Sequence, residues 1–226
     1  LRRQRQMCLR NSLGPVLSNG IANLHNARRA NSPIINIVGN HPNYHVGFDA
    51  PLTSNIDTLA RNYSSWIKSE STESTLAQDG ADAYTATLRQ TPGSQGQIAT
   101  LIMGADAAWG ESRGPVAPNA LPQRSKIASN VIDAIASKIE AGGKVALLLE
   151  HHGVSPEALA NASKISAKTG CRLFTGTFPA RVDGGPGNPE VERLPYFPEQ
   201  VLQTLTGLDH LALPYTQPTP PTTTGG

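Results

Sequence analysis

The sequence predicts an α/β fold class: two parallel-sheet domains with helices on both faces. Short runs of β-branched and aliphatic residues, at 34–38, 98–102 and 145–149, are bounded by turn residues, as buried parallel strands are. Segments with helical spacing separate these runs. In the second half of the chain, strands and helices alternate regularly, which is typical of a parallel sheet covered by helices.

The composition is that of a globular protein and excludes several other classes. The 226 residues can form one large domain or two small ones. The net charge is only +2, and no stripe of Lys and Arg with interleaved aromatics occurs, so we expect no nucleic-acid partner. No run of about 18 apolar residues occurs, so we expect no membrane span. Two cysteines, Cys8 and Cys171, suit a reducing compartment, which favours the cytoplasm, with an organelle as the alternative.

The first predicted domain, residues 11–112, alternates helices with buried strands. Its helices are expected to end where Asn31-Ser32-Pro33 and Thr91-Pro92-Gly93 interrupt the helical pattern. The predicted elements are a helix from Ser18 or Asn19 to Ala30, a strand at 34–38, a polar loop or loop and short helix over 40–58, a short strand at Trp66-Ile67, a helix from Ser74 to Leu88 and a strand at 98–102.

A linker is predicted at 113–124, because this stretch holds three prolines and has no periodicity. The second domain, 125–213, follows it. Its predicted elements are a helix at 125–140, a strand at 145–149, a helix after the N-cap Ser155 that ends near Thr169-Gly170, a strand at 172–175, a long loop at 176–197, a helix at 198–205 and a strand at 211–213.

The two ends of the chain differ from the rest. The first ten residues, LRRQRQMCLR, carry four arginines and no acidic residue. We interpret them as a fragment boundary or an aberrant start in preference to a transit peptide, because they lack an amphipathic repeat. The Pro/Thr-rich tail, 214–226, is expected to be disordered.

The loop that follows strand 34–38 holds the densest group of side chains able to do chemistry. Ligands of open α/β sheets bind beyond the carboxyl ends of the strands, and histidines there can hydrogen-bond a polar substrate or transfer protons. The alternative is a loop whose side chains satisfy nearby backbone groups. The side chains in question are Asn40, His41, Asn43, Tyr44, His45 and Asp49.

Other motifs indicate no further site. The sequence contains neither GxxxxGK[ST] nor GxGxxG, the usual phosphate-binding loops. Glu150-His151-His152 follows a strand but has no evident third ligand, so we interpret it as a solvent-exposed loop. Asp79-Gly80 and Asp183-Gly184-Gly185 are predicted to be turns. We therefore predict no metal ligands in this chain.

A family resemblance narrows these expectations. The stretch GPVLSNGIANLHNARRANSPIINIVGNHPNYHVGFDAPLTSNIDTLA, which begins at Gly14, resembles the later part of the pyrimidine-binding domain of thiamine-diphosphate-dependent enzymes, in particular the acetolactate synthase large-subunit group. IATLIMGADAAW at 98–109 resembles the strand and loop that close that domain. TGCRLFTGTFPARVDGGPGNPEVERLPYFPEQVLQTLTGLDHL resembles the group's central domain. The likeness covers about residues 12–213 and implies a partial thiamine-diphosphate-binding fold plus a Rossmann-like central domain.

The resemblance implies a 2-keto acid decarboxylase or carboligase that uses thiamine diphosphate and Mg²⁺. In that family an early glutamate activates the cofactor and a Gly-Asp-Gly…Asn motif in a third domain holds the metal. Here no glutamate precedes Glu70, and the third domain is missing. Val16 stands where the family's turn has its second glycine, and valine would be strained there if the position requires a positive φ. We therefore predict no catalytic residue in this chain, an inactive chain when alone, and no FAD.

The candidate site residues follow from these two lines of reasoning. Gly14 and Asn19 match the family's Gly-Pro-Gly-x-x-Asn turn and are predicted to bind the cofactor, as is Asn40 by its place after a strand. His41 and His45 are predicted to face the substrate. The expected partners are a 2-keto acid and a second copy of the chain or a full-length paralogue. The alternative function is a non-catalytic relative that acts only in subunit assembly.

Overall fold

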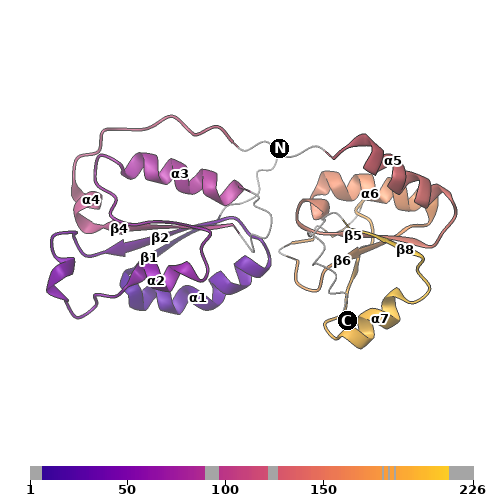
Figure 1. The fold of residues 1–226 in the computed structure, drawn as a ribbon, viewed down its shortest axis with the longest axis horizontal. Coiled ribbons are helices and arrows are strands. Elements are labelled where there is room, and N and C mark those ends of the chain that lie inside the picture. Colours follow the sequence, from indigo (N-terminus) through magenta and orange to yellow (C-terminus); the bar gives the residue numbers. More distant parts are fainter. Residues whose placement is uncertain are drawn as a thin grey trace, which may run out of the picture. The chain divides into compact units, whose positions relative to one another are not determined.

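The computed structural model divides the chain into two compact units, Leu1–Gln123 and Arg124–Gly226. Each unit is built on a four-stranded sheet whose paired strands are all parallel (Figure 1), which confirms the predicted fold class. The tail at 214–226, which was predicted to be disordered, lies outside the described residues. The structure describes residues 7–89, 97–121, 127–179, 181–182, 184–185 and 187–213, and describes 7–12 and 151–152 by their backbone alone.

The first sheet has the strand order β1-β2-β4-β3. The two apolar strands β2 and β4 lie in the centre and pair from Ile34–Ile98 to Asn40–Gly104. The edge strand β1 was not predicted, because its sequence, MCLRNS, lacks a strand pattern and it forms by backbone pairing with β2. The strands are β1 (Met7–Ser12), β2 (Ile34–Asn40), β3 (Trp66–Lys68) and β4 (Ile98–Gly104).

Helices cover both faces of the first sheet, α1 and α2 on one face and α3 on the other (Figure 1). Leu24 of α1 belongs to the same buried cluster as Val38 and Ile98, whereas Ala83 of α3 clusters with Ala99 on the opposite face. This alternation along the strands places every second side chain in each core layer. The helices are α1 (Leu13–Arg29), η1 (Val46–Phe48), α2 (Ile56–Arg61), α3 (Leu76–Leu88) and α4 (Ala105–Trp109).

The start of α1 corrects the sequence prediction. The helix begins at Leu13, so the segment from Gly14 to Asn19 is helical and not a turn followed by a helix at Ser18 or Asn19. Pro15 fits there because backbone N–H groups in the first helical turn have no intrahelical partner. Asp79-Gly80 also lies within a helix, α3, and not in a turn.

The second sheet has the order β7-β6-β5-β8. The N-cap at Ser155, whose Oγ accepts from the Ala158 N–H at 3.4 Å, and the left-handed Gly170 confirm the predicted limits of α6. The two-residue β7 lies within the predicted loop 176–197, and α5 begins later than residue 125. The elements are α5 (Ser129–Glu140), β5 (Val145–Leu149), η2 (His151–Val154), α6 (Pro156–Thr169), β6 (Arg172–Thr175), β7 (Glu192–Arg193), α7 (Pro198–Leu205) and β8 (His210–Ala212).

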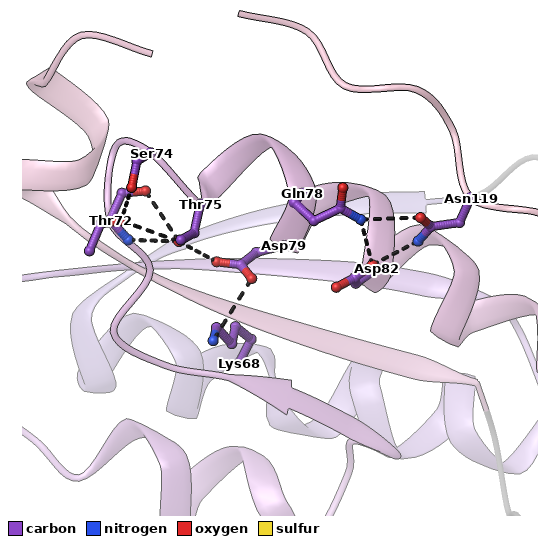
Figure 2. Close-up of polar contacts among 8 residues, drawn as sticks. All are labelled: Lys68, Thr72, Ser74, Thr75, Gln78, Asp79, Asp82 and Asn119. Carbon is purple, nitrogen blue, oxygen red and sulfur yellow. Dashed lines mark hydrogen bonds and ion pairs between the residues drawn. The ribbon is translucent and has the colours of Figure 1, made fainter. Parts of the chain in front are cut away.

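The segment after α4 runs without helix or strand through residue 121 and is tied to α3 (Figure 2). Asn119 Nδ2 donates to Asp82 Oδ1 at 2.7 Å, and Gln78 Nε2 donates to both Asp82 Oδ1 and Asn119 Oδ1, at 2.9 and 3.1 Å. These hydrogen bonds lower the pKa of the Asp82 carboxyl. The predicted linker is therefore held against the first unit at Asn119, while the assignment of 113–124 as a domain linker stays a prediction.

Candidate functional site

The carboxyl ends of β1, β2, β3 and β4 lie along one edge of the first sheet, because all neighbouring strands are parallel. We call this the carboxyl edge of the first sheet. It comprises the segments that follow the strands, residues 13–14, 40–54, 69–71 and 104–106. Ligand sites of α/β proteins are built at such edges.

Backbone strain collects at this edge. Four non-glycine residues have a positive φ in the part of the chain that the structure describes, and three of them are Leu13 (58°), Asp49 (50°) and Glu70 (59°) at the carboxyl edge. A left-handed conformation costs a residue with a side chain about 1–2 kcal/mol, and such strain is typical of functional sites. Val16 lies in α1 and is not among the four, so the strain inferred for it from the resemblance is absent.

Buried polar atoms without a hydrogen-bond partner gather at the same edge. Among the described residues six such side-chain atoms occur, and five of them belong to the carboxyl edge of the first sheet. An unsatisfied buried donor or acceptor costs about 1–3 kcal/mol. A ligand or water that forms hydrogen bonds with these atoms would remove this cost, so the edge favours binding of a polar group. The five atoms are His41 Nε2, Thr53 Oγ1, Ser69 Oγ, Ser71 Oγ and Asp106 Oδ1.

The two residues predicted from the family turn lie in different surroundings. Gly14 is buried, is the second residue of α1 after the end of β1, and has no room for a Cβ, which would overlap the Ser54 side chain. Glycine is therefore required there by the close approach of the two segments. Asn19 is exposed and lies more than one turn further along α1, so the structure does not bring it to the carboxyl edge.

The three residues predicted after β2 lie together. Asn40 is the last residue of β2, and its Oδ1 accepts from the His41 backbone N–H at 2.9 Å. This side chain therefore satisfies a nearby backbone group, which is the alternative to a ligand-binding role that the sequence left open. The His41 and His45 rings meet edge to face with centroids 5.5 Å apart, and the His45 ring lies 5.6 Å from that of Phe48. Both histidines are half-buried, and only the His41 ring has a buried nitrogen without a partner among the described residues.

Asp106 is the carboxyl-edge residue that sequence reasoning missed. Its Oδ2 accepts from the Asn43 backbone N–H at 3.1 Å, which joins the loop after β2 to the end of β4. Its signal was its place in the loop after strand 98–102, the same reasoning that found His41. Ser69 and Ser71 follow the short β3 and gave no such signal, because three residues of strand do not stand out from their neighbours.

Lys68 at the end of β3 and Asp79 of α3 connect these two elements (Figure 2). The buried Asp79 accepts from Thr75 Oγ1 at 2.9 Å, and its other oxygen lies 3.9 Å from Lys68 Nζ. Both carboxylate oxygens are thereby engaged, so Asp79 has a structural role. Across the described residues, no group of three or more histidine, cysteine or acidic side chains could hold a metal ion.

The carboxyl edge of the second sheet is less well equipped. Thr175 Oγ1 is its one buried unpartnered side-chain atom among the described residues, and a Cβ at Gly176 would lie 2.8 Å from Glu150 Oε1. Two cavities of about 450 and 360 Å³ also belong to the second unit. The larger is apolar and lies between α5 and β8, and the smaller lies beside Lys144 and Arg172, where β5 and β6 begin. Neither coincides with a group of unsatisfied polar atoms.

Comparison with known proteins gives one close sequence relative. The chain is 41% identical, over 201 residues, to a Mycobacterium tuberculosis protein with the provisional name acetolactate synthase large subunit IlvX. The match covers 89% of this chain and 38% of the relative. No protein-family model matches the chain.

Solved structures with the same fold agree with this match. They include a provisionally named thiamin diphosphate-dependent enzyme from Mycobacterium smegmatis (TM-score 0.74, 18% identity, 91% of this chain and 39% of that one). They also include a thiamine diphosphate-dependent 4-hydroxybenzoylformate decarboxylase from Rhodococcus jostii RHA1 (0.74, 16%, 94% and 42%) and a benzoylformate decarboxylase from Polynucleobacter necessarius (0.70, 16%, 92% and 39%). The chain spans about two fifths of the length of these proteins.

Proposed function

We propose that this chain, a homologue of the acetolactate synthase large-subunit group of thiamine-diphosphate-dependent enzymes, supplies one wall of a thiamine-diphosphate site at the carboxyl edge of its first sheet. The observation that carries the proposal is the gathering of five unpartnered buried polar atoms at this edge. The complete protein would act on a 2-keto acid as a decarboxylase or carboligase, either a lyase or a transferase. We place it in the cytoplasm, with an organelle as the alternative.

The donor set at the carboxyl edge fits the aminopyrimidine part of the cofactor. An aminopyrimidine offers an amino group that donates and ring nitrogens that accept hydrogen bonds. Ser69, Ser71 and Thr53 carry hydroxyls that can donate or accept, and the buried Asp106 Oδ1 can accept. The diphosphate and its Mg²⁺ need oxygen ligands, and no metal-binding group occurs among the described residues. We therefore expect this chain to hold the pyrimidine end, with the Mg²⁺ end held by another polypeptide segment.

Thiamine diphosphate, when bound, supplies the nucleophilic carbon and the electron sink for loss of carbon dioxide from a 2-keto acid. In the proposal, the residues of this chain bind the pyrimidine end of the cofactor and orient the substrate. His41 Nε2, which is buried and has no hydrogen-bond partner among the described residues, would orient the substrate carboxylate or carry a proton. His45, packed between His41 and Phe48, would hold the His41 ring in place. Because no described residue supplies the activating carboxylate, we expect the chain alone to turn over no 2-keto acid.

Calorimetry with thiamine diphosphate and Mg²⁺ tests the proposal. We expect the Ser71→Ala variant, which lacks one of the unpartnered hydroxyls, to bind thiamine diphosphate at least about tenfold more weakly than the wild type, a loss of about 1.4 kcal/mol. His25→Ala is the control, since His25 is exposed on α1 and this variant should bind as the wild type does. Equal affinity of the wild type and Ser71→Ala would contradict the role assigned to the hydroxyls, and absence of binding to the wild type would contradict the cofactor site.

The rival function is assembly without catalysis, in which the chain pairs with a second copy or a full-length paralogue. It is favoured by three exposed aromatic side chains at or beside the carboxyl edge: Tyr44 (74% exposed), Phe48 (75%) and Trp109 (80%). Sedimentation of the chain, alone and mixed with a full-length relative, tests it. Assembly that persists in the Trp109→Ser variant, or a monomer under all conditions, would count against this surface as the interface.

A further inference from the structure

We infer that Asp106 is a positioning residue for the loop that carries His41 and His45. The inference rests on the proposed function for the roles of those histidines, but its geometry lies within the described residues. Asp106 lies in the first turn of α4, which begins directly after β4, and the histidines come from the loop after β2. These two segments are 63 residues apart at the Asp106–Asn43 contact and lie on neighbouring strands of the sheet.

The contact joins one side-chain oxygen of α4 to one backbone N–H of the loop after β2. Asp106 Oδ2 accepts from the Asn43 backbone N–H, and Asn43 is the second residue of the turn in which the His45 N–H donates to the Pro42 carbonyl at 2.8 Å. One carboxylate oxygen therefore fixes the middle of the turn that separates the two histidines. The distance between their rings depends on this turn, because His41 precedes it and His45 ends it.

The packing behind the contact leaves little freedom. A Cβ at Gly104 would overlap Asp106 Oδ1 and lie 3.4 Å from both the His41 carbonyl oxygen and Asn43 Oδ1. The end of β4, the Asp106 carboxylate and the loop after β2 thus occupy one closely packed volume. Asp106 cannot move away without opening a space beneath His41. Its second oxygen, buried and without a hydrogen-bond partner in the described part of the chain, shows that the carboxylate is held by this single contact.

The test compares three variants by nuclear magnetic resonance without cofactor. Asp106→Ala should raise hydrogen exchange at the Asn43 amide at least about tenfold and abolish the ring-to-ring contact of His41 with His45. Asp106→Asn keeps an acceptor oxygen and should restore both signals. Asp57→Ala is the matched control, because Asp57 pairs with Arg61 on α2 and does not touch the loop.

A donor-side variant keeps the inference testable if Asp106→Ala does not fold. Asn43→Pro removes the N–H while proline suits the second position of a turn, so it should also abolish the histidine contact. Retention of the His41–His45 contact in either folded variant overturns the inference, as does failure of Asp106→Asn to restore it. A positive result together with no binding of thiamine diphosphate by the wild type would leave the positioning role standing and contradict the proposed function alone.

Discussion

The two units share an architecture and differ in what they place at the carboxyl ends of their strands. Each has four parallel strands and covering helices, and each carries a histidine-containing segment after a central strand. In the first unit that edge gathers strained backbone and five unsatisfied buried atoms, whereas in the described part of the second it has one, Thr175 Oγ1. A histidine-containing segment at the carboxyl end of a parallel strand is therefore not enough to identify a binding site, because the second unit has such a segment without the group of unsatisfied polar atoms.

The units also differ in how completely their helices are buried. In the first unit, α1 buries Leu17 and Leu24 against the sheet. In the second, no residue of α5 or α7 is buried, and α5 exposes Val131, Ile132 and Ile135. The helices α5 and α7 therefore bury less of their surface than α1 does, whereas α6 buries Leu159. The following predictions compare the two units, from the largest expected effect to the smallest.

Leucine truncation should separate the two units most strongly. Leu24→Ala removes a side chain that is 1% exposed on α1 and should lower the free energy of unfolding by about 2–5 kcal/mol. Leu202→Ala, on α7 where the side chain is 72% exposed, should change it by less than about 0.5 kcal/mol. Urea denaturation measures both, and equal losses would mean that α7 is buried as completely as α1.

Glycines at the two strand ends should differ by a smaller amount. Gly104→Ala places a Cβ against Asp106 and the His41 backbone and should cost about 1–3 kcal/mol. A Cβ at Gly176 would lie 2.8 Å from Glu150 Oε1, closer than ordinary contact, but that atom ends a flexible side chain, so a small shift costing about 1 kcal/mol or less should accommodate Gly176→Ala. Thermal unfolding monitored by circular dichroism distinguishes them, and a larger loss for Gly176→Ala would reverse the comparison.

Removing an unpartnered hydroxyl should leave stability unchanged or raise it by up to about 1 kcal/mol in either unit, because a buried group without a partner is a cost. Ser71→Ala and Thr175→Val make this change in the first and second units. Only Ser71→Ala should also weaken binding of thiamine diphosphate. Weaker binding in Thr175→Val instead would move the site to the second unit.

The tie between Asp82 and Asn119 should give the smallest effect. Hydrogen bonds from Asn119 and Gln78 hold the pKa of the Asp82 carboxyl below its ordinary value of 3.8. The stability this adds is present above that value and is lost as the pH falls through the lowered folded-state pKa. Asn119→Ala should therefore raise the Asp82 pKa, seen in a carboxyl-carbon titration, and cost less than about 1 kcal/mol at neutral pH. An unchanged pKa would contradict the assignment of the Asn119 hydrogen bond as the main cause of the shift.

Much of the fold could be predicted from the sequence because its central strands are apolar and the limits of α6 are marked by an N-cap serine and a terminal glycine. The strands at 34–38, 98–102 and 145–149 are confirmed, as are the N-cap at Ser155 and the end of α6. The strands that were missed, β1 and β7, are edge strands that form by pairing with a neighbour. The six residues of β1 lack an alternating or continuous apolar pattern, and the two of β7 are charged.

The candidate site could be predicted in part. The loop after β2 was found because a dense polar segment follows a buried strand. Asp106 and Ser71 were missed because their importance depends on which strands are neighbours, and strand order is not evident from local pattern. The start of α1 was misplaced because Gly14 and Pro15 resemble a turn, although both fit the first turn of a helix.

The central claim is that the carboxyl edge of the first sheet holds the cofactor's pyrimidine end. Among the helices of the described residues, none is long and apolar enough to cross a membrane. The chemical shifts of the backbone amides should be followed while thiamine diphosphate is added to about 10 mM. This concentration is high enough to detect a binding free energy as weak as about −4 kcal/mol, which corresponds to a Kd of about 1 mM. We predict shifts concentrated at His41, Asn43, Ser71 and Asp106. Shifts confined to the second unit, or no shifts at all, would contradict the account.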